Sequence, residues 1–492
     1  MGGHEVGAGE GGSETSARLF YVRSRKEVSM NTTLSILLTV ALIVIFIVCL
    51  VKKIKPTIII MVLVALLGAI LFTIFSGGSS ILGDKGTGNV FLDCFELFQS
   101  TMTKQMSGAL LTILAVLGYV GYMNKLGASD KFALICSKPF TKLKNPYILC
   151  SGVILLVFVL KLAIPSATSL AALMLATMYP VLRAAGCSAL TSGSCIMIAT
   201  GFIWGPADTM TAQIFSVAGF QTMTVPEFFA AYHVPTMCVM VPFAMIAFPL
   251  YSFLCDKHAA KKGVAVEGNA TTDVRIAEPD CPGYYALFPL FPLVLVIIFS
   301  KLVVGTIVLS VIGAVFVSII LTMIIDLIHS RKIQTCFDNA NTFFIAMADF
   351  LKNGGWLIIP AAMFATVLSS MGGLQAIAQL LSNAGGNGYL ICAIGCVLCM
   401  PIVICCGSVT ATIAIAAPLM VSIASVTGLD VNICFMAVLV MLGMSSCMCP
   451  VHPQTIMVST AAGAELMTLV KRNAPIACLI IAAGMIGCFI LC

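Results

Sequence analysis

Residues 147–182 read YILCSGVILLVFVLKLAIPSATSLAALMLATMYPVL. Two apolar runs, Tyr147–Ile164 and Ser169–Leu182, meet here at the polar turn Ile164-Pro165-Ser166-Ala167-Thr168. A helix needs about 20 residues to cross the hydrocarbon core of a bilayer, so both runs are short for a full crossing. We therefore predict a re-entrant hairpin whose tip stops inside the membrane, with two full spans as the alternative.

A second stretch repeats this arrangement, with the turn Cys406-Gly407-Ser408-Val409-Thr410 between two further apolar runs. Other landmarks recur in the same order at a nearly constant separation, which indicates an internal duplication. The matched pairs are Gly108 and Gly355, Gly127 and Gly372, Ser166 and Ser408, Pro206 and Pro450, and Pro235 and Pro475, at separations of 247, 245, 242, 244 and 240 residues.

The composition places both copies in a membrane. Of the 492 residues, 60% are hydrophobic and only 9% are charged, whereas soluble globular proteins carry roughly 25% charged residues. Apolar runs of spanning length recur from Leu34 to Cys492. The predicted fold class is an all-α polytopic membrane protein with two repeats, each of five transmembrane helices plus one re-entrant hairpin.

An odd number of crossings in each repeat implies that the two repeats are inverted relative to each other. With the N-terminus outside, 18 Lys and Arg residues fall in the cytoplasm, and only Lys85, Lys104 and Lys301 fall outside. The positive-inside rule favours this arrangement, although the basic cluster between Arg18 and Lys26 opposes it. We expect a flexible leader or non-native start at 1–29, the first repeat at 30–257, a cytoplasmic linker at 258–282 and the second repeat at 283–492.

The hairpin tips are the predicted substrate site. A helix end inside a membrane has unpaired backbone groups, which must line a cavity or bind a ligand, and the N-terminal end attracts anions. The alternative is that the hydroxyls bond back to a preceding carbonyl, but their duplication at both tips favours a site. The candidate residues are Ser166, Ala167, Thr168, Gly407, Ser408, Val409 and Thr410.

The span after each hairpin is predicted to be broken, because Pro removes a backbone donor and Gly loosens the turn. The breaks read Trp204-Gly205-Pro206-Ala207-Asp208-Thr209 and Cys449-Pro450-Val451-His452-Pro453-Gln454-Thr455. Ionisable groups inside a membrane are functional candidates, although Asp208 and His452 can equally be helix caps. The candidates for ion coupling or gating here are Pro206, Asp208, Thr209, Pro450, His452 and Thr455.

Lys161 is a further candidate for ion coupling, as a basic residue within a predicted hairpin arm. It can snorkel or pair with a carboxylate, and it can equally replace a bound cation or attract the substrate. His233 and Asn473 each stand two residues before a matched Pro, so we expect them to cap the starts of helices. The 21 cysteines are scattered through apolar runs and lack the ligand spacing of a zinc site, so we expect no metal site.

Several short stretches resemble the anaerobic C4-dicarboxylate carriers of the DcuC type, within the ion-transporter superfamily. They are Gly127-Ala128-Ser129-Asp130, Ser137-Lys138-Pro139, Asn145-Pro146-Tyr147, Ser166-Ala167-Thr168 through Leu175-Ala176-Thr177-Met178-Tyr179-Pro180, and Val470-Lys471-Arg472. The resemblance covers essentially everything after Met30.

This resemblance implies a multi-pass carrier of succinate, fumarate or similar dianions in the bacterial inner membrane. It further implies coupling to H⁺ or Na⁺ or an exchange mechanism, and a homodimer. The second tip departs from the family pattern, which tends to read Gly-Ser-Gly-Asn, and Lys161, His452 and Pro453 are also atypical. These departures bear on the substrate and the coupling ion.

Three other functions compete with a dicarboxylate carrier. An exchanger of amino acids or short monocarboxylates would use the same architecture, and a cation/proton antiporter would use Asp208 without an organic anion. An enzyme is disfavoured, because the apolar segments contain no Ser/His arrangement, no His-Glu-x-x-His and no Asp-rich motif. The net charge of +6 is dispersed along the chain and does not indicate nucleic-acid binding, and no cofactor other than Na⁺ or H⁺ is expected.

Overall fold

The computed structural model describes residues 31–51, 57–107, 109–139, 145–206, 208–218, 223–261, 280–299, 309–352, 355–383 and 387–492. Within these ranges every regular element is a helix. The predicted leader at 1–29 and most of the predicted linker at 258–282 lie outside the described residues.

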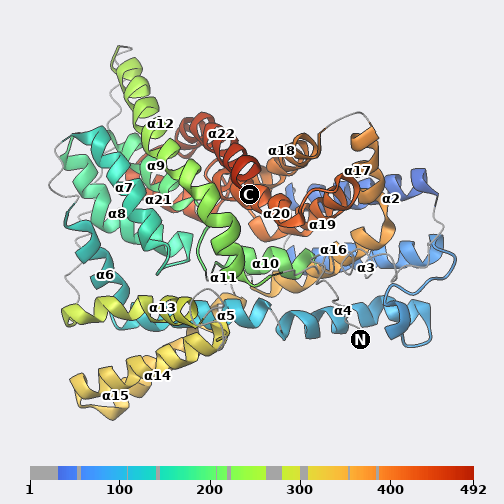
Figure 1. The fold of residues 1–492 in the computed structure, drawn as a ribbon, viewed down its shortest axis with the longest axis horizontal. Helices are drawn as coiled ribbons and strands as arrows, with labels where there is room; N and C mark the ends of the chain where they lie inside the picture. Colours follow the sequence, from blue (N-terminus) through green and yellow to red (C-terminus); the bar gives the residue numbers. More distant parts are fainter. Residues whose placement is uncertain are drawn as a thin grey trace, which may run out of the picture.

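The first half of the chain begins with long helices, continues with a hairpin and a broken helix, and ends in one long helix (Figure 1). Its elements are α2 (Thr32–Val51), α3 (Thr57–Phe75), η1 (Gly83–Lys85), α4 (Val90–Met106), α5 (Ala109–Lys125), α6 (Ala128–Ser137), α7 (Pro146–Leu160), α8 (Ala167–Ala184), α9 (Ala189–Thr200), α10 (Thr209–Ala218), α11 (Val225–Phe228), η3 (Phe229–His233) and α12 (Val234–Lys261).

The second half repeats this order. Its elements are η4 (Gly283–Leu290), α13 (Phe291–Ile298), α14 (Val311–Ser330), α15 (Ile333–Lys352), η5 (Gly355–Leu357), α16 (Ile358–Met371), α17 (Gly373–Asn383), α18 (Gly388–Cys406), α19 (Val409–Thr427), α20 (Val431–Ser446), α21 (Pro453–Ala462) and α22 (Leu466–Leu491). By length and composition, six helices of the described residues can cross a membrane, or nine if each bent helix pair is one span.

Polar side chains fix where the hairpins and broken helices begin. Asn145 accepts hydrogen bonds from two N–H groups of the first turn of α7, and Asn387 accepts one from Tyr389 at the start of α18. Ser188 and Asp430 do the same for α9 and α20. A side-chain oxygen at the N-cap accepts hydrogen bonds from N–H groups that have no partner within the helix. Polar N-caps therefore mark the start of equivalent helices in both halves.

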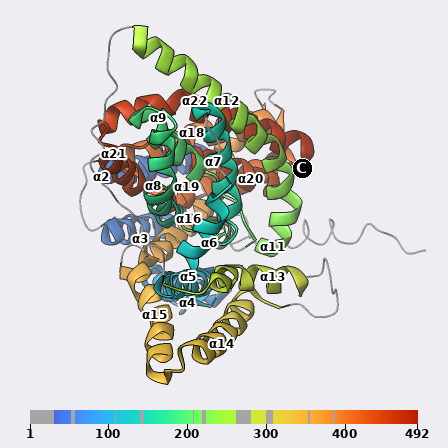
Figure 2. The ribbon, with the colours of Figure 1, turned by 90° about the vertical axis from the view of Figure 1, so that its left-hand side faces the viewer.

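The helices form two groups, seen together in Figures 1 and 2. The first, which we call the hairpin body, comprises α7–α9, α12 and α18–α22, with α12 packed on both α7 and α22. The second, which we call the scaffold, comprises α2–α6, η4 and α13–α17, where α5 packs on α15 and α16 packs on α3. Helix α10 lies between the groups, in contact with α5, α16 and α19, and α19 itself also packs on α16 and α17 of the scaffold.

Contacts between the two halves of the chain come in exchanged pairs. Helix α5 packs on α14 as α16 packs on α3, and α6 packs on η4 as α17 packs on α2. Helix α8 likewise contacts α21 as α19 contacts α10. In these three cases a first-half element meets the second half as its counterpart meets the first half.

Two amphipathic helices precede the bends in the scaffold. Helix α4 is bent by 47° from α5, and α15 is bent by 55° from α16. Together with α14, α15 projects from one end of the molecule (Figures 1 and 2). The outer faces of this pair carry exposed apolar side chains, including Ile320, Ile328 and Phe344, which is the surface expected in contact with lipid.

Candidate functional site

The first hairpin tip ends the arm α7 and begins the arm α8. Ser166 is the N-cap of α8, and its Oγ accepts a hydrogen bond from the Ser169 N–H at 3.3 Å. The side chain is half-buried, whereas Thr168 in the first turn is exposed. The Ser166 hydroxyl therefore does not bond back to a preceding carbonyl, and its own proton remains free to donate to a ligand.

The second tip has the same cap and packs against both broken helices. Ser408 Oγ accepts a hydrogen bond from the Ala411 N–H at 3.2 Å, and Thr410 Oγ1 lies 3.4 Å from Gln213 Oε1 of α10. Gly407 ends α18 with φ +67°, and a Cβ at this position would lie 2.9 Å from a side-chain carbon of Val451. The tip is therefore placed between the second break and the helix that follows the first break.

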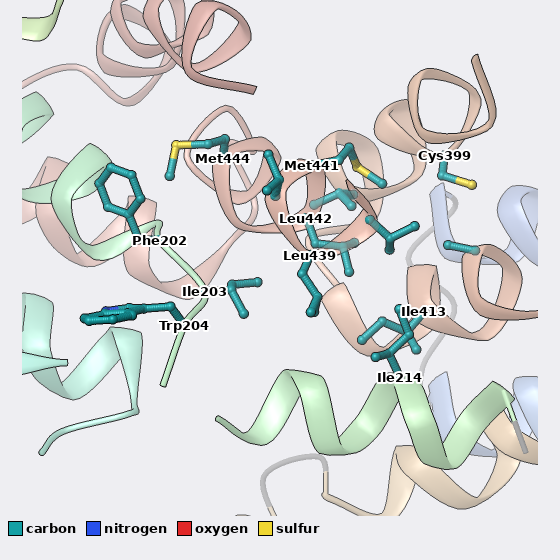
Figure 3. Close-up of a cluster of buried hydrophobic side chains, with 14 of the residues drawn as sticks. Phe202, Ile203, Trp204, Ile214, Cys399, Ile413, Leu439, Met441, Leu442 and Met444 are labelled. Atoms are coloured by element: carbon teal, nitrogen blue, oxygen red, sulfur yellow. The ribbon is translucent and has the colours of Figure 1, made fainter. Parts of the chain in front are cut away.

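The first break runs from the end of α9 at Thr200 to the start of α10 at Thr209. The indole of Trp204 stacks on Phe158 with 3.6 Å between ring centroids, and its Nε1 donates to the Phe158 carbonyl at 3.1 Å. Figure 3 shows Phe202 and Ile203 of the unwound stretch beside Met444 of α20. Aromatic and apolar contacts thus fix the unwound stretch in place of helical hydrogen bonds.

Asp208 is buried at the end of this break. Its side chain is 4% exposed, and Oδ2 accepts hydrogen bonds from the N–H and the Oγ1 of Thr211 at 2.7 and 2.8 Å. Its geometry is that of an N-cap for α10. Capping does not exclude a role in coupling, because a buried carboxylate at a helix start can still bind a proton or a cation.

His233 takes part in the same hydrogen-bond network, contrary to the expectation that it caps a helix. The Gly205 N–H donates to Nδ1 at 3.4 Å, and Nε2 lies 3.4 Å from Thr211 Oγ1. Because Nδ1 accepts, the ring proton is on Nε2, and a chain of hydrogen bonds joins Gly205, His233, Thr211 and Asp208. The π-helical turn η3 ends at His233, and such turns are frequent at functional sites.

Asn473, the counterpart of His233, supports the second break. It lies inside α22, where its Nδ2 donates to the Cys447 carbonyl at 3.2 Å and its Oδ1 accepts a hydrogen bond from Ser194 of α9. The prediction that Asn473 caps a helix start is therefore also wrong. Both side chains instead hold backbone groups of an unwound segment.

His452 is the N-cap residue of α21, but its side chain makes no capping bond. Among the described residues its buried Nδ1 has no hydrogen-bond partner, and the same is true of Gln213 Nε2. Thr455 is buried with Oγ1 3.5 Å from the Ser446 carbonyl, and Pro450 is half-buried within the break. Unpartnered buried polar atoms indicate that a ligand or water completes the site.

The two breaks meet where α9 and α20 cross at glycines. A Cβ on Gly443 would lie 2.2 Å from the carbonyl oxygen of Gly201, so the backbones touch. Cys447 Sγ lies 3.2 Å from the Met197 carbonyl, and Gln454 Nε2 donates to Thr200 Oγ1. The broken helices therefore form one continuous site, with the second tip against it.

The Lys161 ammonium binds backbone carbonyls of the first break. It follows the last residue of α7, its side chain is 3% exposed, and Nζ donates to the carbonyls of Thr200, at 2.9 Å, and Phe202. Its described hydrogen bonds thus go to carbonyls and not to a carboxylate, and its burial rules out snorkelling to the membrane surface.

Two clefts separate this region from the scaffold. One narrow cleft lies between the first tip and the scaffold and is lined by Pro165, Pro206, Tyr119 and Pro292, among other largely apolar residues. The other, narrower still, is lined by Thr112 of α5 and by Pro206, Asp208 and Thr209. Pro206 lines both clefts, so the first break faces the boundary between the two groups of helices.

Metal-binding side chains do not converge in the described part of the chain, where no group of three His, Cys, Asp or Glu residues is placed to hold an ion. The polar groups of the site are instead hydroxyls, amides, carbonyls and the Lys161 ammonium. Such groups suit a small anion with several oxygens, and the carbonyls suit a monovalent cation.

The sequence from residue 34 to residue 492 matches the model of the DcuC family, described as C4-dicarboxylate anaerobic carrier. A Vibrio cholerae protein named "Probable anaerobic C4-dicarboxylate transporter DcuC" is 27% identical over 376 residues, covering 75% of this chain and 79% of that protein. The anaerobic C4-dicarboxylate transporter DcuC of Escherichia coli K12 is 23% identical over 337 residues, covering 67% of this chain and 71% of that protein.

Two solved transporters share the fold. The YdaH transporter of Alcanivorax borkumensis superposes with a TM-score of 0.57 at 15% identity, covering 87% of this chain and 96% of that one. The MtrF protein of Neisseria gonorrhoeae superposes with a TM-score of 0.54 at 15% identity, covering 88% and 95%.

Proposed function

The chain belongs to the DcuC family of C4-dicarboxylate anaerobic carriers, and on this basis we propose that it is a secondary transporter of succinate, fumarate or a similar dianion. It is a multi-pass membrane transporter and not an enzyme. The cell membrane of a bacterium, the inner membrane where there are two, is its proposed location.

The observation that carries this function is the pair of capped helix starts next to the two breaks, since Gly407 of the second tip lies against Val451 and Pro165 of the first tip lines a cleft with Pro206. Ser166 and Ser408 each cap a hairpin arm while keeping a hydroxyl proton free. The N–H groups of the first turn at Ala167, Thr168, Val409 and Thr410 add donors at the positive ends of the two helix dipoles. Two such ends suit a solute with one carboxylate at each end.

We propose that the two halves are inverted repeats, 30–257 and 283–492, joined by a cytoplasmic linker at 258–282, with re-entrant hairpins at α7–α8 and α18–α19. The exchanged contact pairs of the overall fold support this symmetry. So does the predicted distribution of basic residues, since an odd number of crossings per repeat keeps them in the cytoplasm.

Coupling to H⁺ or Na⁺ is assigned to the breaks. Asp208 lines a cleft at the scaffold boundary and ends the hydrogen-bond chain from His233. His452 is the second candidate, because its buried Nδ1 has no hydrogen-bond partner among the described residues and can accept a proton or a ligand hydrogen bond. Pro206, Thr209, Pro450 and Thr455 shape the unwound backbone that these groups occupy.

A homodimer is the proposed assembly. The projecting pair α14–α15 exposes apolar side chains such as Phe337 and Phe344, both more than half exposed. A second copy packed on the scaffold would leave the hairpin body free to move, as alternating access requires.

Uptake of labelled succinate into proteoliposomes tests the function. Uptake driven by a proton gradient, a sodium gradient or internal dicarboxylate supports it, and competition by unlabelled fumarate but not by amino acids or acetate defines the substrate class. Proton flux without any organic anion would instead indicate a cation/proton antiporter, and no succinate uptake under all three gradients would overturn the proposal.

A further inference from the structure

A buried ammonium binds the carbonyls of the first break, and among the described residues no charged side chain does so at the second. Lys161 is 3% exposed, and its Nζ donates to the carbonyls of Thr200 and Phe202. Its position 242 residues later, the separation of the two hairpin tips, is Val403, which is fully buried. The two copies therefore share the fold but differ in charge at this position.

The acceptors at the first break are backbone carbonyl oxygens, which normally bind a cation or strong hydrogen-bond donors. Helix α9 is buried along all of its residues, so water does not reach the carbonyls at its C-terminal end. These carbonyls carry the negative end of the helix dipole. In membrane transporters, unwound carbonyls and half-helix C-terminal ends coordinate Na⁺.

Neutral donors satisfy the corresponding carbonyls of the second break. The counterparts of Thr200 and Phe202, 244 residues later, are Met444 and Ser446. Their carbonyls accept hydrogen bonds from the Cys447 and Cys449 N–H groups at 3.1 and 3.3 Å. A positive charge is thus not needed merely to close a break of this kind. At the first break His233, the counterpart of Asn473, accepts from Gly205 instead, which leaves the carbonyls to Lys161.

We propose that the Lys161 ammonium is a tethered cation that occupies the coupling-ion position of the first break, so that this half of the carrier binds no free Na⁺. This inference rests on the proposed function, because a coupling-ion position has meaning only in a carrier. It limits any free coupling cation to other parts of the site. Removing the side chain should leave a vacant, carbonyl-lined cation site.

The test is the thermal unfolding midpoint of purified full-length Lys161→Ala in NaCl, in methylammonium chloride and in choline chloride at equal ionic strength. We expect Na⁺ or methylammonium to raise the midpoint of the variant relative to choline by roughly 3 °C at saturating salt. Methylammonium should not raise the midpoint of the wild type or of Lys104→Ala, whose side chain is exposed on α4, and Na⁺ bound elsewhere in the site should shift all of these proteins equally.

Lys161→Met serves as the second variant, since it keeps the length of the side chain and removes the charge. If either variant unfolds in choline, it should be recovered as a monodisperse protein from Na⁺ or methylammonium. Equal midpoints in all three salts, or failure to recover both variants in any salt, would overturn the tethered-cation proposal. Because no dicarboxylate is present, this outcome is independent of whether the wild type takes up succinate.

Discussion

Gly201 and Gly443 set the distance between the two broken helices. A side chain on Gly443 would collide with a backbone carbonyl rather than with a flexible group. We predict that Gly443→Ala destabilises the protein by about 1–3 kcal/mol and lowers uptake, because α20 must move away from α9. Gly283→Ala is the matched control, since a Cβ there meets no atom within 4 Å. Equal unfolding midpoints for the two variants would contradict the crossing.

His233 acts on transport through the first break. His233→Phe keeps the edge-on ring contact with Phe228 and removes both ring nitrogens, which leaves the buried Gly205 N–H without its acceptor. An unsatisfied buried donor costs about 1–3 kcal/mol, and we predict a fall in succinate uptake of about tenfold.

The control for this variant is His329→Phe, at an exposed histidine of α14. A His233→Phe protein whose uptake has the wild-type rate and pH profile would show that His233 has no role in transport. A loss of rate with an unchanged pH profile would limit it to supporting the break.

The hairpin arms are the elements that bring donors to the site. We predict that Ser408→Asp keeps the cap of α19, because Asp is as good an N-cap as Ser, while its charge repels a carboxylate. Unfolding midpoints near that of the wild type with uptake abolished would separate binding from capping. Ser408→Ala should show the opposite balance, with about 1 kcal/mol less stability and only weakened uptake. Uptake by Ser408→Asp at the wild-type rate would remove this tip from the substrate site.

Much of this architecture can be predicted from the sequence. Every span must be apolar over a minimum length, and its backbone groups must form hydrogen bonds within the protein. The run Thr57–Phe75 is one helix with those bounds, and both polar turns separate two helices. The sequence analysis does not predict the short amphipathic helices α6 and α17, because segments of ten or eleven residues are hard to distinguish from loops in a sequence.

The contacts within the site are harder to predict. Nothing local in the sequence shows that His233 reaches Gly205 or that Gln454 reaches Thr200, because these pairs form only when separate helices pack. The link from Asp208 through Thr211 to His233 likewise depends on tertiary packing. The signal that does exist is the duplication itself, since His233 and Asn473 occupy matched positions.

At the scale of the whole molecule, one ion pair joins the last long helices of the two halves. Arg472 of α22 donates to Asp256 of α12 at 2.8 Å and to Thr191 of α9 at 2.7 Å. The two side chains are 8% and 19% exposed. We predict that Arg472→Ala alone costs about 3 kcal/mol, because it leaves a largely buried carboxylate unpaired.

A double-mutant cycle with Asp256→Ala checks this prediction. The double variant should be destabilised by about 1–3 kcal/mol less than the sum of the single variants. Strict additivity of the unfolding free energies would mean that the two halves are not coupled through this pair.

We propose that a dicarboxylate binds where the hairpin tips meet the broken helices. Cryo-EM density of the full-length protein in lipid nanodiscs with saturating succinate, compared with a succinate-free sample, would locate this ligand. We predict density that appears only with succinate, contacts the α8 and α19 N-termini at Ser166 and Ser408, and lies beside the crossing of α9 and α20. Succinate-dependent density elsewhere, with both tips empty, would contradict it.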